Sequence, residues 1–302
     1  MSKHVAVLMG GWSAEREVSL DSGRACADAL REAGYTTSEI DVTRNLQALL
    51  DGLQPAPNAV FNALHGRFGE DGTIQAILNV LGIPYTHSGL PASALAMDKP
   101  LAIALFTAKG IRCPQGRIMA ASDIMHTHPL PRPYVLKPAR EGSSVGVIIV
   151  NEGDNGPSLE GWEFGDILVE PYVSGRELTV AVMGERALGV TELRPLQGFY
   201  DYEAKYTDGR TEHLCPAPVP DDVGTLAQEW AVLAHQALGC RGVSRADFRW
   251  DDSAGTEGLY LLEVNTQPGM TALSLVPEQA AKVGMSFPEL VNWMVENAAC
   301  DA

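Results

Sequence analysis

Two short apolar segments near the C-terminal end of the sequence each carry polar residues at alternate positions. The first holds Arg245 and Asp247, and the second holds Glu263 and Asn265. Because side chains alternate between the two faces of a strand, each pair shares a face, so two carboxylates and an amide can converge. Such oxygen ligands suit magnesium, which takes further ligands from substrate phosphates. A solvent-exposed strand face is the alternative, since exposed Asp and Glu are common.

A second candidate site is a loop of small residues, KPAREGSSVG, at residues 137–146. Backbone amides of Gly and Ser can surround phosphate oxygens, and Lys137 places a positive charge at the start of the loop. The lysine precedes the glycines and a strand follows, so this is not the GxxxxGK[ST] phosphate loop. A plain hairpin turn is the alternative. Lys99, at the start of an expected helix, and Lys205, beside Tyr206, are each more typical of surface lysines when taken alone.

Three other segments have the residue types of ligand-binding loops. Residues 168–177 form an apolar strand that runs into a bend, which suits an adenine hinge with Glu177 near the ribose and equally suits a hairpin. Residues 10–19 and 65–72 each follow an expected strand of an open sheet, at the edge where such sheets bind ligands. The GxGxxG pattern of dinucleotide binding is absent. A lone His65 would usually be structural, but its polar neighbours favour a functional role.

The elements that must position these residues follow two patterns. In the N-terminal part, the apolar run at residues 5–9 predicts a buried parallel strand, followed by a helix whose apolar face includes Val18 and Leu30. Further strands are expected at residues 37–42 and 59–62, and further helices at residues 46–50 and 73–81. This alternation predicts an open parallel sheet.

After a boundary between Pro84 and Pro114, the pattern changes. Helices are expected at residues 93–96 and 100–109. The strands expected next, which suggest a largely antiparallel sheet, are residues 115–119, 134–137, 145–150, 167–170, 178–183 and 187–193. Residues 198–213 are polar and aromatic without periodicity, which predicts a functional or disordered loop. A helix at 223–238 precedes the two strands, 243–250 and 259–265, that carry the carboxylates.

The composition limits the classes of protein. The 302 residues, 45% hydrophobic and 20% charged, are typical of a globular protein of two or three α/β lobes. With 38 acidic against 22 basic residues and no basic run, a nucleic-acid partner is not expected. The five cysteines form no CxxC pair, which argues against zinc and for a reducing compartment. No apolar stretch reaches the roughly 20 residues of a membrane span, and the N-terminal run is too short for a signal peptide, so we expect a soluble cytoplasmic protein with no membrane partner.

Taken in order, the motifs of this chain resemble those of the D-alanine:D-alanine ligases of the ATP-grasp superfamily. They are GGWSAEREVS at 10–19, HGRFGEDG at 65–72, KPAREGSSVG at 137–146 and EVNTQPGMT at 263–271. The resemblance implies an α/β fold with a three-lobed ATP-grasp architecture and an N-terminal open parallel sheet. The lobes would comprise residues 1–98, 99–182 and 183–302, with a lid at 198–213 and ATP between the second and third lobes. A homodimer is also implied.

The implied reaction converts ATP and two D-alanine molecules to D-alanyl-D-alanine, ADP and phosphate through a D-alanyl phosphate, for peptidoglycan precursor synthesis. Two Mg²⁺ or Mn²⁺ ions would assist ATP. By resemblance, the metal ligands are Asp247, Glu263 and Asn265. The ATP site would comprise Lys99 and Lys137 at the phosphates, Lys205 at the γ-phosphate from the lid, and Glu170, Val173 and Glu177 at adenosine.

The resemblance also implies roles around the amino acids. Arg245 and the backbone amide of Gly269 would stabilise the tetrahedral oxyanion. Glu15 would hold the ammonium of the first D-alanine, with His65 nearby. Ser274 would bind the carboxylate of the second D-alanine. Ser143 and Tyr206 would link Glu15 to the lid.

Some residues depart from the family pattern. Pro171 stands where many relatives carry a lysine facing adenine, and Gln267 replaces a small residue. Ala272 and Leu273 precede Ser274 in place of a more polar pair. We expect altered packing and an unchanged reaction. The alternatives are a D-alanine:D-lactate or D-alanine:D-serine ligase, the lactate form being disfavoured by Tyr206, and a nucleotide-binding regulatory module without turnover.

Overall fold

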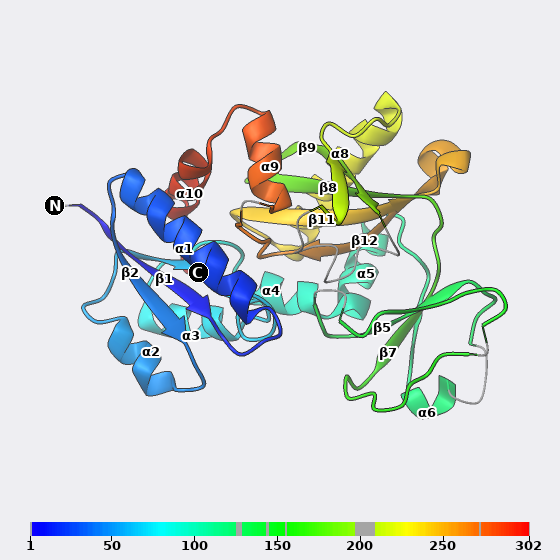
Figure 1. Ribbon diagram of the computed structural model, residues 1–302, viewed down its shortest axis with the longest axis horizontal. Coiled ribbons are helices and arrows are strands. Elements are labelled where there is room, and N and C mark those ends of the chain that lie inside the picture. Colours follow the sequence, from blue (N-terminus) through cyan, green and yellow to red (C-terminus); the bar gives the residue numbers. More distant parts are fainter. Residues whose placement is uncertain are drawn as a thin grey trace.

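The computed structural model describes residues 2–124, 129–142, 145–154, 156–196, 209–271 and 273–301. Within these ranges the strands form three sheets, of three, four and five strands. Figure 1 shows the three-stranded sheet with its helices at one end of the molecule and the other two sheets at the opposite end. The helices α4 (Leu90–Met97) and α5 (Lys99–Ala108) connect the two ends.

The N-terminal sheet is parallel, with the order β2–β1–β3, as its sequence predicts. Its strands are β1 (His4–Gly10), β2 (Thr36–Val42) and β3 (Ala59–Asn62), and its helices are α1 (Arg16–Glu32), α2 (Leu46–Gly52) and α3 (Thr73–Leu81). Alternate residues of β1 pack on opposite faces: Val5 and Val7 join the core that contains Leu30 of α1, whereas Leu8 joins the core that contains Leu78 of α3. Burial on both faces explains the continuous apolar run of β1.

The four-stranded sheet is antiparallel, with the order β4–β7–β5–β6. Its elements are β4 (Arg117–Met119), the short helix α6 (Ala121–Ile124), β5 (Tyr134–Pro138), β6 (Ile148–Val150) and β7 (Ile167–Pro171). Tyr134, Leu136 and Val169 are buried on one face of this sheet, together with Ile124 of α6. The opposite face of β5 contributes Val135 and Lys137 to a cavity described below.

The five-stranded sheet is antiparallel, with the order β10–β9–β8–β11–β12. Its elements are β8 (Arg176–Met183), β9 (Arg186–Pro195), β10 (Thr211–Leu214), β11 (Val243–Trp250), the 3-10 segment η1 (Asp252–Gly258) and β12 (Leu259–Asn265). Helix α8 (Asp221–Leu238) packs on the face that carries Val180, whereas α9 (Leu275–Lys282) packs on the face that carries Ala181. Helix α10 (Phe287–Glu296) packs on α1 and so joins the C-terminal end of the chain to the N-terminal sheet (Figure 1).

The structure corrects two expectations, one about the antiparallel strands and one about the loop at residues 198–213. The run of strands expected to form one antiparallel sheet forms two, because β7 pairs with β4 and β5 whereas β8 pairs with β9 and β11. The change of sheet therefore falls between β7 and β8. The expected lobe boundary at residue 183 lies at the end of β8 and stays a prediction. Residues 211–213 of the expected loop belong to strand β10 (Thr211–Leu214), whereas residues 198–208 of that loop lie outside the described residues. Helices α9 and α10 were not expected. In the described part of the chain, no helix is both long and apolar enough to cross a membrane.

Candidate active site

The polar residues of β11 and β12 face one another across the strand pair. Asp247 lies opposite Glu263, and Arg245 lies opposite Asn265. The guanidinium of Arg245 donates to both carboxylate oxygens of Asp247, at 2.8 and 2.6 Å, and the hydroxyl of Thr179 on β8 donates to Asp247 Oδ1 at 2.7 Å. The alternation of side chains along the strands thus brings both carboxylates and the amide to one site, and the alternative of a fully solvated face does not hold for Asp247, whose side chain is 15% exposed.

Two lysines approach this site from other elements. Lys99 is the first residue of α5, whose N-terminus is capped by Asp98, and its Nζ lies 3.7 Å from a carboxylate oxygen of Glu263 and donates to the backbone carbonyl of Glu141. Lys137 on β5 lies 2.7 Å from the carboxylate of Glu170 on β7. Both lysine side chains are more than four-fifths buried, so neither is a surface lysine.

The environment of Lys137 keeps it charged. Burial by itself lowers the pKa of an ammonium, but the carboxylates of Glu170, Glu263 and Glu177 outweigh this effect and raise the pKa of Lys137. Glu170 is 2% exposed and forms its ion pair inside the protein. The ion pair therefore holds the positive charge of Lys137 near the carboxylate of Glu263 on β12.

A cavity opens between the four-stranded and five-stranded sheets, next to Lys137. It holds about 920 Å³ of free space, including the part open to solvent. Its walls combine apolar side chains from both sheets with charged groups at one end. The apolar walls include Val135, Val147, Ile149, Val173 and Leu262, and the charged groups include Lys99, Lys137, Glu170, Glu177, Asp247 and Glu263. Apolar walls with a few convergent charges are typical of a site for a cofactor-sized ligand.

Arg249 shapes the connection between β7 and β8 at the edge of this cavity. Its guanidinium donates to the backbone carbonyls of Val173 and Gly175, at 3.1 and 3.0 Å, and to the hydroxyl of Tyr172 at 3.0 Å. It also lies 3.4 Å from the carboxylate of Glu177. Arg249 was not among the predicted site residues, although the alternation that identified Arg245 and Asp247 places it on the same face of β11.

A second, more polar cavity adjoins the first. Both cavities are lined by Lys99, Glu141, Gly142 and Glu263. The second cavity is also lined by Glu70, Arg245, Asn265, Gly269 and Ser274. The Ser274 hydroxyl precedes α9 and accepts from the backbone N–H of Thr271 at 2.9 Å, and a Cβ at position 269 would lie 2.8 Å from the Ser274 Oγ. Glycine at position 269 therefore lets the backbone lie close to this hydroxyl.

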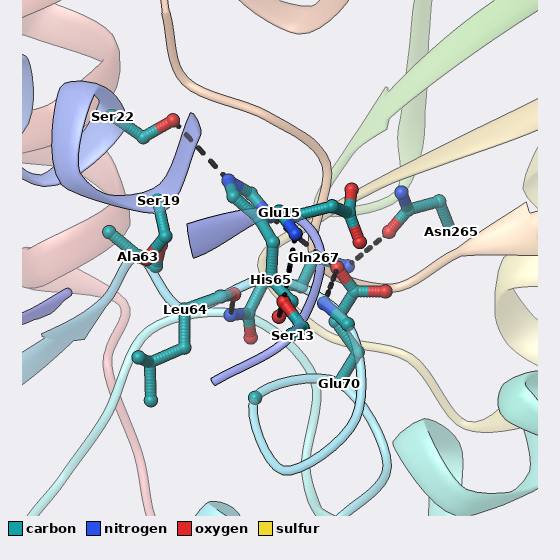
Figure 2. A network of polar contacts seen from close by, with 12 residues as sticks. Ser13, Glu15, Ser19, Ser22, Ala63, Leu64, His65, Glu70, Asn265 and Gln267 are labelled. Atoms are coloured by element: carbon teal, nitrogen blue, oxygen red, sulfur yellow. Dashed lines mark hydrogen bonds and ion pairs between the residues drawn. The ribbon is translucent and has the colours of Figure 1, made fainter. Parts of the chain in front are cut away.

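Glu15, His65 and Glu70 form a buried polar cluster beside the second cavity (Figure 2). His65 Nδ1 lies 3.4 Å from Glu70 Oε1, which also accepts from the backbone N–H of Gly66 at 2.9 Å. His65 Nε2 lies 3.3 Å from the Ser22 hydroxyl. Burial alone lowers the pKa of His65, but Glu70 and Glu15 outweigh it and raise that pKa; burial, assisted by Glu15, also raises the pKa of Glu70. The cluster therefore binds protons more readily than its separate side chains.

The predicted site residues fall into three groups. Seven line the first cavity: Lys99, Lys137, Glu170, Val173, Glu177, Asp247 and Glu263. Four line the second cavity: Arg245, Asn265, Gly269 and Ser274. Glu15 and His65 do not line it but lie close to Glu70, which does. Ser143, Lys205 and Tyr206 lie outside the described residues. Sequence reasoning gave no role to Glu141, which borders both cavities and lies 3.3 Å from Arg67 of the loop that carries His65.

Comparison with known proteins places this geometry in context. The family described as "D-ala D-ala ligase C-terminus" matches residues 115–296, and the family described as "D-ala D-ala ligase N-terminus" matches residues 44–88. The D-alanine–D-alanine ligase of Acidiphilium cryptum (strain JF-5) is 59% identical over 301 residues, which are 99% of each chain.

Solved structures are similar over the full length as well. The D-alanine–D-alanine ligase of Bacillus anthracis complexed with ATP matches 98% of this chain and 97% of its own, with a TM-score of 0.81 and 29% identity. The VanG D-Ala:D-Ser ligase of Enterococcus faecalis matches 98% of this chain and 99% of its own, with a TM-score of 0.78 and 28% identity.

Proposed function

Because the chain belongs to the D-alanine–D-alanine ligase family, we propose that it joins two D-alanine molecules into D-alanyl-D-alanine for peptidoglycan precursor synthesis. The reaction consumes one ATP and releases ADP and phosphate. The observation that carries the proposal is the shared wall of Lys99, Glu141, Gly142 and Glu263 between the two cavities. A phosphoryl group must pass from a nucleotide to an amino acid, and two adjoining cavities with charged groups at their junction suit that transfer.

ATP occupies the cavity between the two antiparallel sheets in this proposal. The adenosine lies along the apolar wall near Glu170, Val173 and Glu177, and the phosphates extend toward Lys99 and Lys137. The protein carries a net charge of −16, so the two buried lysines must supply a local positive field for the polyphosphate.

The donor set on β11 and β12 fits magnesium or manganese. Asp247, Glu263 and Asn265 offer carboxylate and amide oxygens as ligands, and Lys99 and Lys137 lie near them, where phosphate oxygens would complete the coordination. No cluster of three His, Cys, Asp or Glu side chains suited to a metal occurs among the residues that the structure describes. When bound, two ions would offset charge on the transferring phosphoryl group.

The first D-alanine lies in the second cavity beside Glu15, whose carboxylate attracts the ammonium group, with His65 behind it. One carboxylate oxygen of this substrate attacks the γ-phosphorus of ATP. An O–P bond forms, the bond to the β-phosphate oxygen breaks, and ADP leaves with the electron pair. The product is D-alanyl phosphate.

The second D-alanine binds with its carboxylate at Ser274, and its neutral amine attacks the carbonyl carbon of D-alanyl phosphate. Arg245 and the backbone N–H of Gly269 stabilise the negative oxygen of the tetrahedral intermediate. Phosphate then leaves, the amine loses a proton, and the peptide bond is complete. As the family resemblance implies, Ser143 and Tyr206 link Glu15 to a lid formed within residues 198–213, and Lys205 of that lid contacts the γ-phosphate.

We propose further that the protein is a homodimer of the cytoplasm, where ATP is available. The five cysteines, none of which forms a disulfide, agree with a reducing compartment. Light scattering coupled to size-exclusion chromatography tests the dimer by the mass of the species in solution.

The reaction is tested by incubating the protein with magnesium and ATP and supplying D-alanine, L-alanine, D-serine or D-lactate. We expect phosphate release and dipeptide formation in equal amounts with D-alanine, and neither product with L-alanine. A main product containing D-serine or D-lactate, when each is offered together with D-alanine, would identify a ligase for another acceptor. Nucleotide binding without turnover would identify a regulatory module.

A further inference from the structure

Gln267 is a buried residue whose hydrogen bonds join two distant parts of the chain. Its side chain is 1% exposed, and its Oε1 accepts from Asn62 Nδ2 at 2.6 Å. Its Nε2 donates to the backbone carbonyl of Leu64. Its own backbone N–H donates to Asn265 Oδ1 at 2.8 Å. The amide is therefore satisfied on both sides, with no water needed.

The partners of Gln267 belong to the two halves of the second cavity. Asn62 and Leu64 end strand β3 and begin the loop that carries His65 and Glu70. Asn265 ends strand β12. Figure 2 shows Gln267 between Leu64 and Asn265, beside the cluster of His65, Glu15 and Glu70.

The loop on the N-terminal side is itself held rigidly. Asn62 Nδ2 also donates to the backbone carbonyl of Gly69 at 3.1 Å, and the same carbonyl accepts from Gln75 Nε2 at 2.8 Å. Asn62 Oδ1 accepts from the backbone N–H of Leu64 at 3.2 Å. A displacement of Gln267 would therefore also displace both ends of the loop that carries Glu70 at the cavity wall.

We infer that Gln267 is a positioning residue that sets the separation between the site of the first D-alanine and the Asn265–Gly269 segment. The inference rests on the proposed function. Gln267 lines neither cavity, so it acts through the groups that it holds: Asn265 through its backbone, and the His65 loop through its side chain. Gln267 lies two residues before Gly269. Its hydrogen bonds therefore also fix the start of the segment whose backbone N–H is the proposed oxyanion donor.

The reaction is sensitive to this separation because D-alanyl phosphate must be attacked by an amine before water reaches it. Reactive groups need to be held within a fraction of an ångström of the productive geometry, and small displacements are costly to rate. A looser junction gives water more time to hydrolyse the acyl phosphate. Each such hydrolysis consumes ATP and releases phosphate but yields no peptide bond.

The test compares phosphate with dipeptide in the same reaction mixture. Gln267→Met keeps the length of the side chain and removes both of its hydrogen bonds. We expect a fall in dipeptide formation of about tenfold, with phosphate release exceeding dipeptide formation, while the KM for ATP stays at the wild-type value. Gln267→Glu keeps the shape and the acceptor but loses the donor to Leu64. It is the second variant, used if Gln267→Met does not fold, and it should also release more phosphate than dipeptide.

Gln279→Met is the matched control. Gln279 is a fully buried glutamine of α9 that accepts from the backbone N–H of Ala181 and donates to the backbone carbonyl of Thr179, and none of these three residues lines the second cavity. We expect this variant to unfold at a lower temperature and still to release equal amounts of phosphate and dipeptide. If the folded Gln267 variants also produce equal amounts at a rate within about twofold of wild type, the inference is wrong. A wild type that makes no dipeptide would instead overturn the proposed function.

Discussion

Asp247 on β11 and Glu263 on β12 are direct neighbours across the strand pair, and Glu263 also lies 3.7 Å from the ammonium of Lys99. Glu263 thus lies between Asp247 and Lys99, one of the two lysines that we propose to bind the phosphates of ATP. We predict that Glu263→Gln folds normally but turns over on the order of 10² to 10³ times more slowly, because an amide cannot supply the negative charge that holds two divalent ions.

For Glu263→Gln, circular dichroism should therefore show the wild-type fold, whereas a MgATP turnover assay should show the loss of rate. Glu229→Gln is the matched control, since Glu229 is exposed on α8, and it should keep wild-type activity. A folded Glu263→Gln protein with near-normal turnover would refute the proposed metal ligands.

The ion pair of Lys137 with Glu170 has a structural and a functional consequence that can be separated. Lys137→Met leaves the buried carboxylate of Glu170 without its partner, so we expect the free energy of unfolding to fall by about 3–5 kcal/mol and the KM for ATP to rise. Lys137→Met combined with Glu170→Gln removes both charges. That double variant should regain part of the lost stability while its KM for ATP remains high.

Urea denaturation and steady-state kinetics on the single and double variants measure both effects. If stability and ATP affinity recover together in the double variant, Lys137 stabilises the fold and does not bind ATP. If neither property changes in the single variant, the ion pair does not matter to the protein.

The pKa values of the buried histidines are shifted in opposite directions from the ordinary value. The pKa of His65 is raised above 6.5, whereas burial lowers the pKa of His87 to about 3 and that of His235 to about 4. In an NMR titration, His65 should gain its proton above pH 6.5, whereas His87 and His235 should stay neutral from neutral pH down to about pH 5. A midpoint for His65 below 6.5 would contradict its contact with Glu70.

The same shift predicts how stability varies with pH. A raised folded-state pKa contributes stability that is fully present below the unfolded value of 6.5 and is lost as the pH rises through the folded-state pKa. The difference in unfolding free energy between the wild type and His65→Gln should therefore be largest in mild acid and decrease toward alkaline pH. A difference that grows with pH would contradict this assignment.

Local geometry explains what the sequence could predict. The alternation of side chains along a strand is independent of the rest of the fold, so the shared faces of Arg245 with Asp247 and of Glu263 with Asn265 could be inferred without a structure. The parallel N-terminal sheet was predictable for a similar reason, since the apolar run of β1 requires cover on both faces.

Contacts between distant segments could not be predicted in this way. Lys137 meets Glu170 because β5 pairs with β7, and Gln267 meets Asn62 across 205 positions of sequence. Neither pairing leaves a periodic signal. The division of the antiparallel strands into two sheets depends likewise on β8 pairing with β11, more than 60 residues later, rather than with β7.

Arg249 offers the last test, because its hydrogen bonds hold the connection between β7 and β8, which is the hinge of the proposed nucleotide cavity. Its guanidinium holds the carbonyls of Val173 and Gly175, and hydrogen bonds from a charged group contribute about 1.5–3 kcal/mol. We predict that Arg249→Ala raises the KM for ATP roughly 10- to 100-fold and changes kcat little, since in the proposed function the hinge contacts adenosine equally in ground and transition states. Arg112→Ala is the matched control: Arg112 also donates to two backbone carbonyls, those of Thr256 and Leu259, and it lines neither cavity. It should lower stability and leave the KM for ATP unchanged. An equal rise in KM for both variants would mean that loss of stability, rather than the hinge, governs ATP binding.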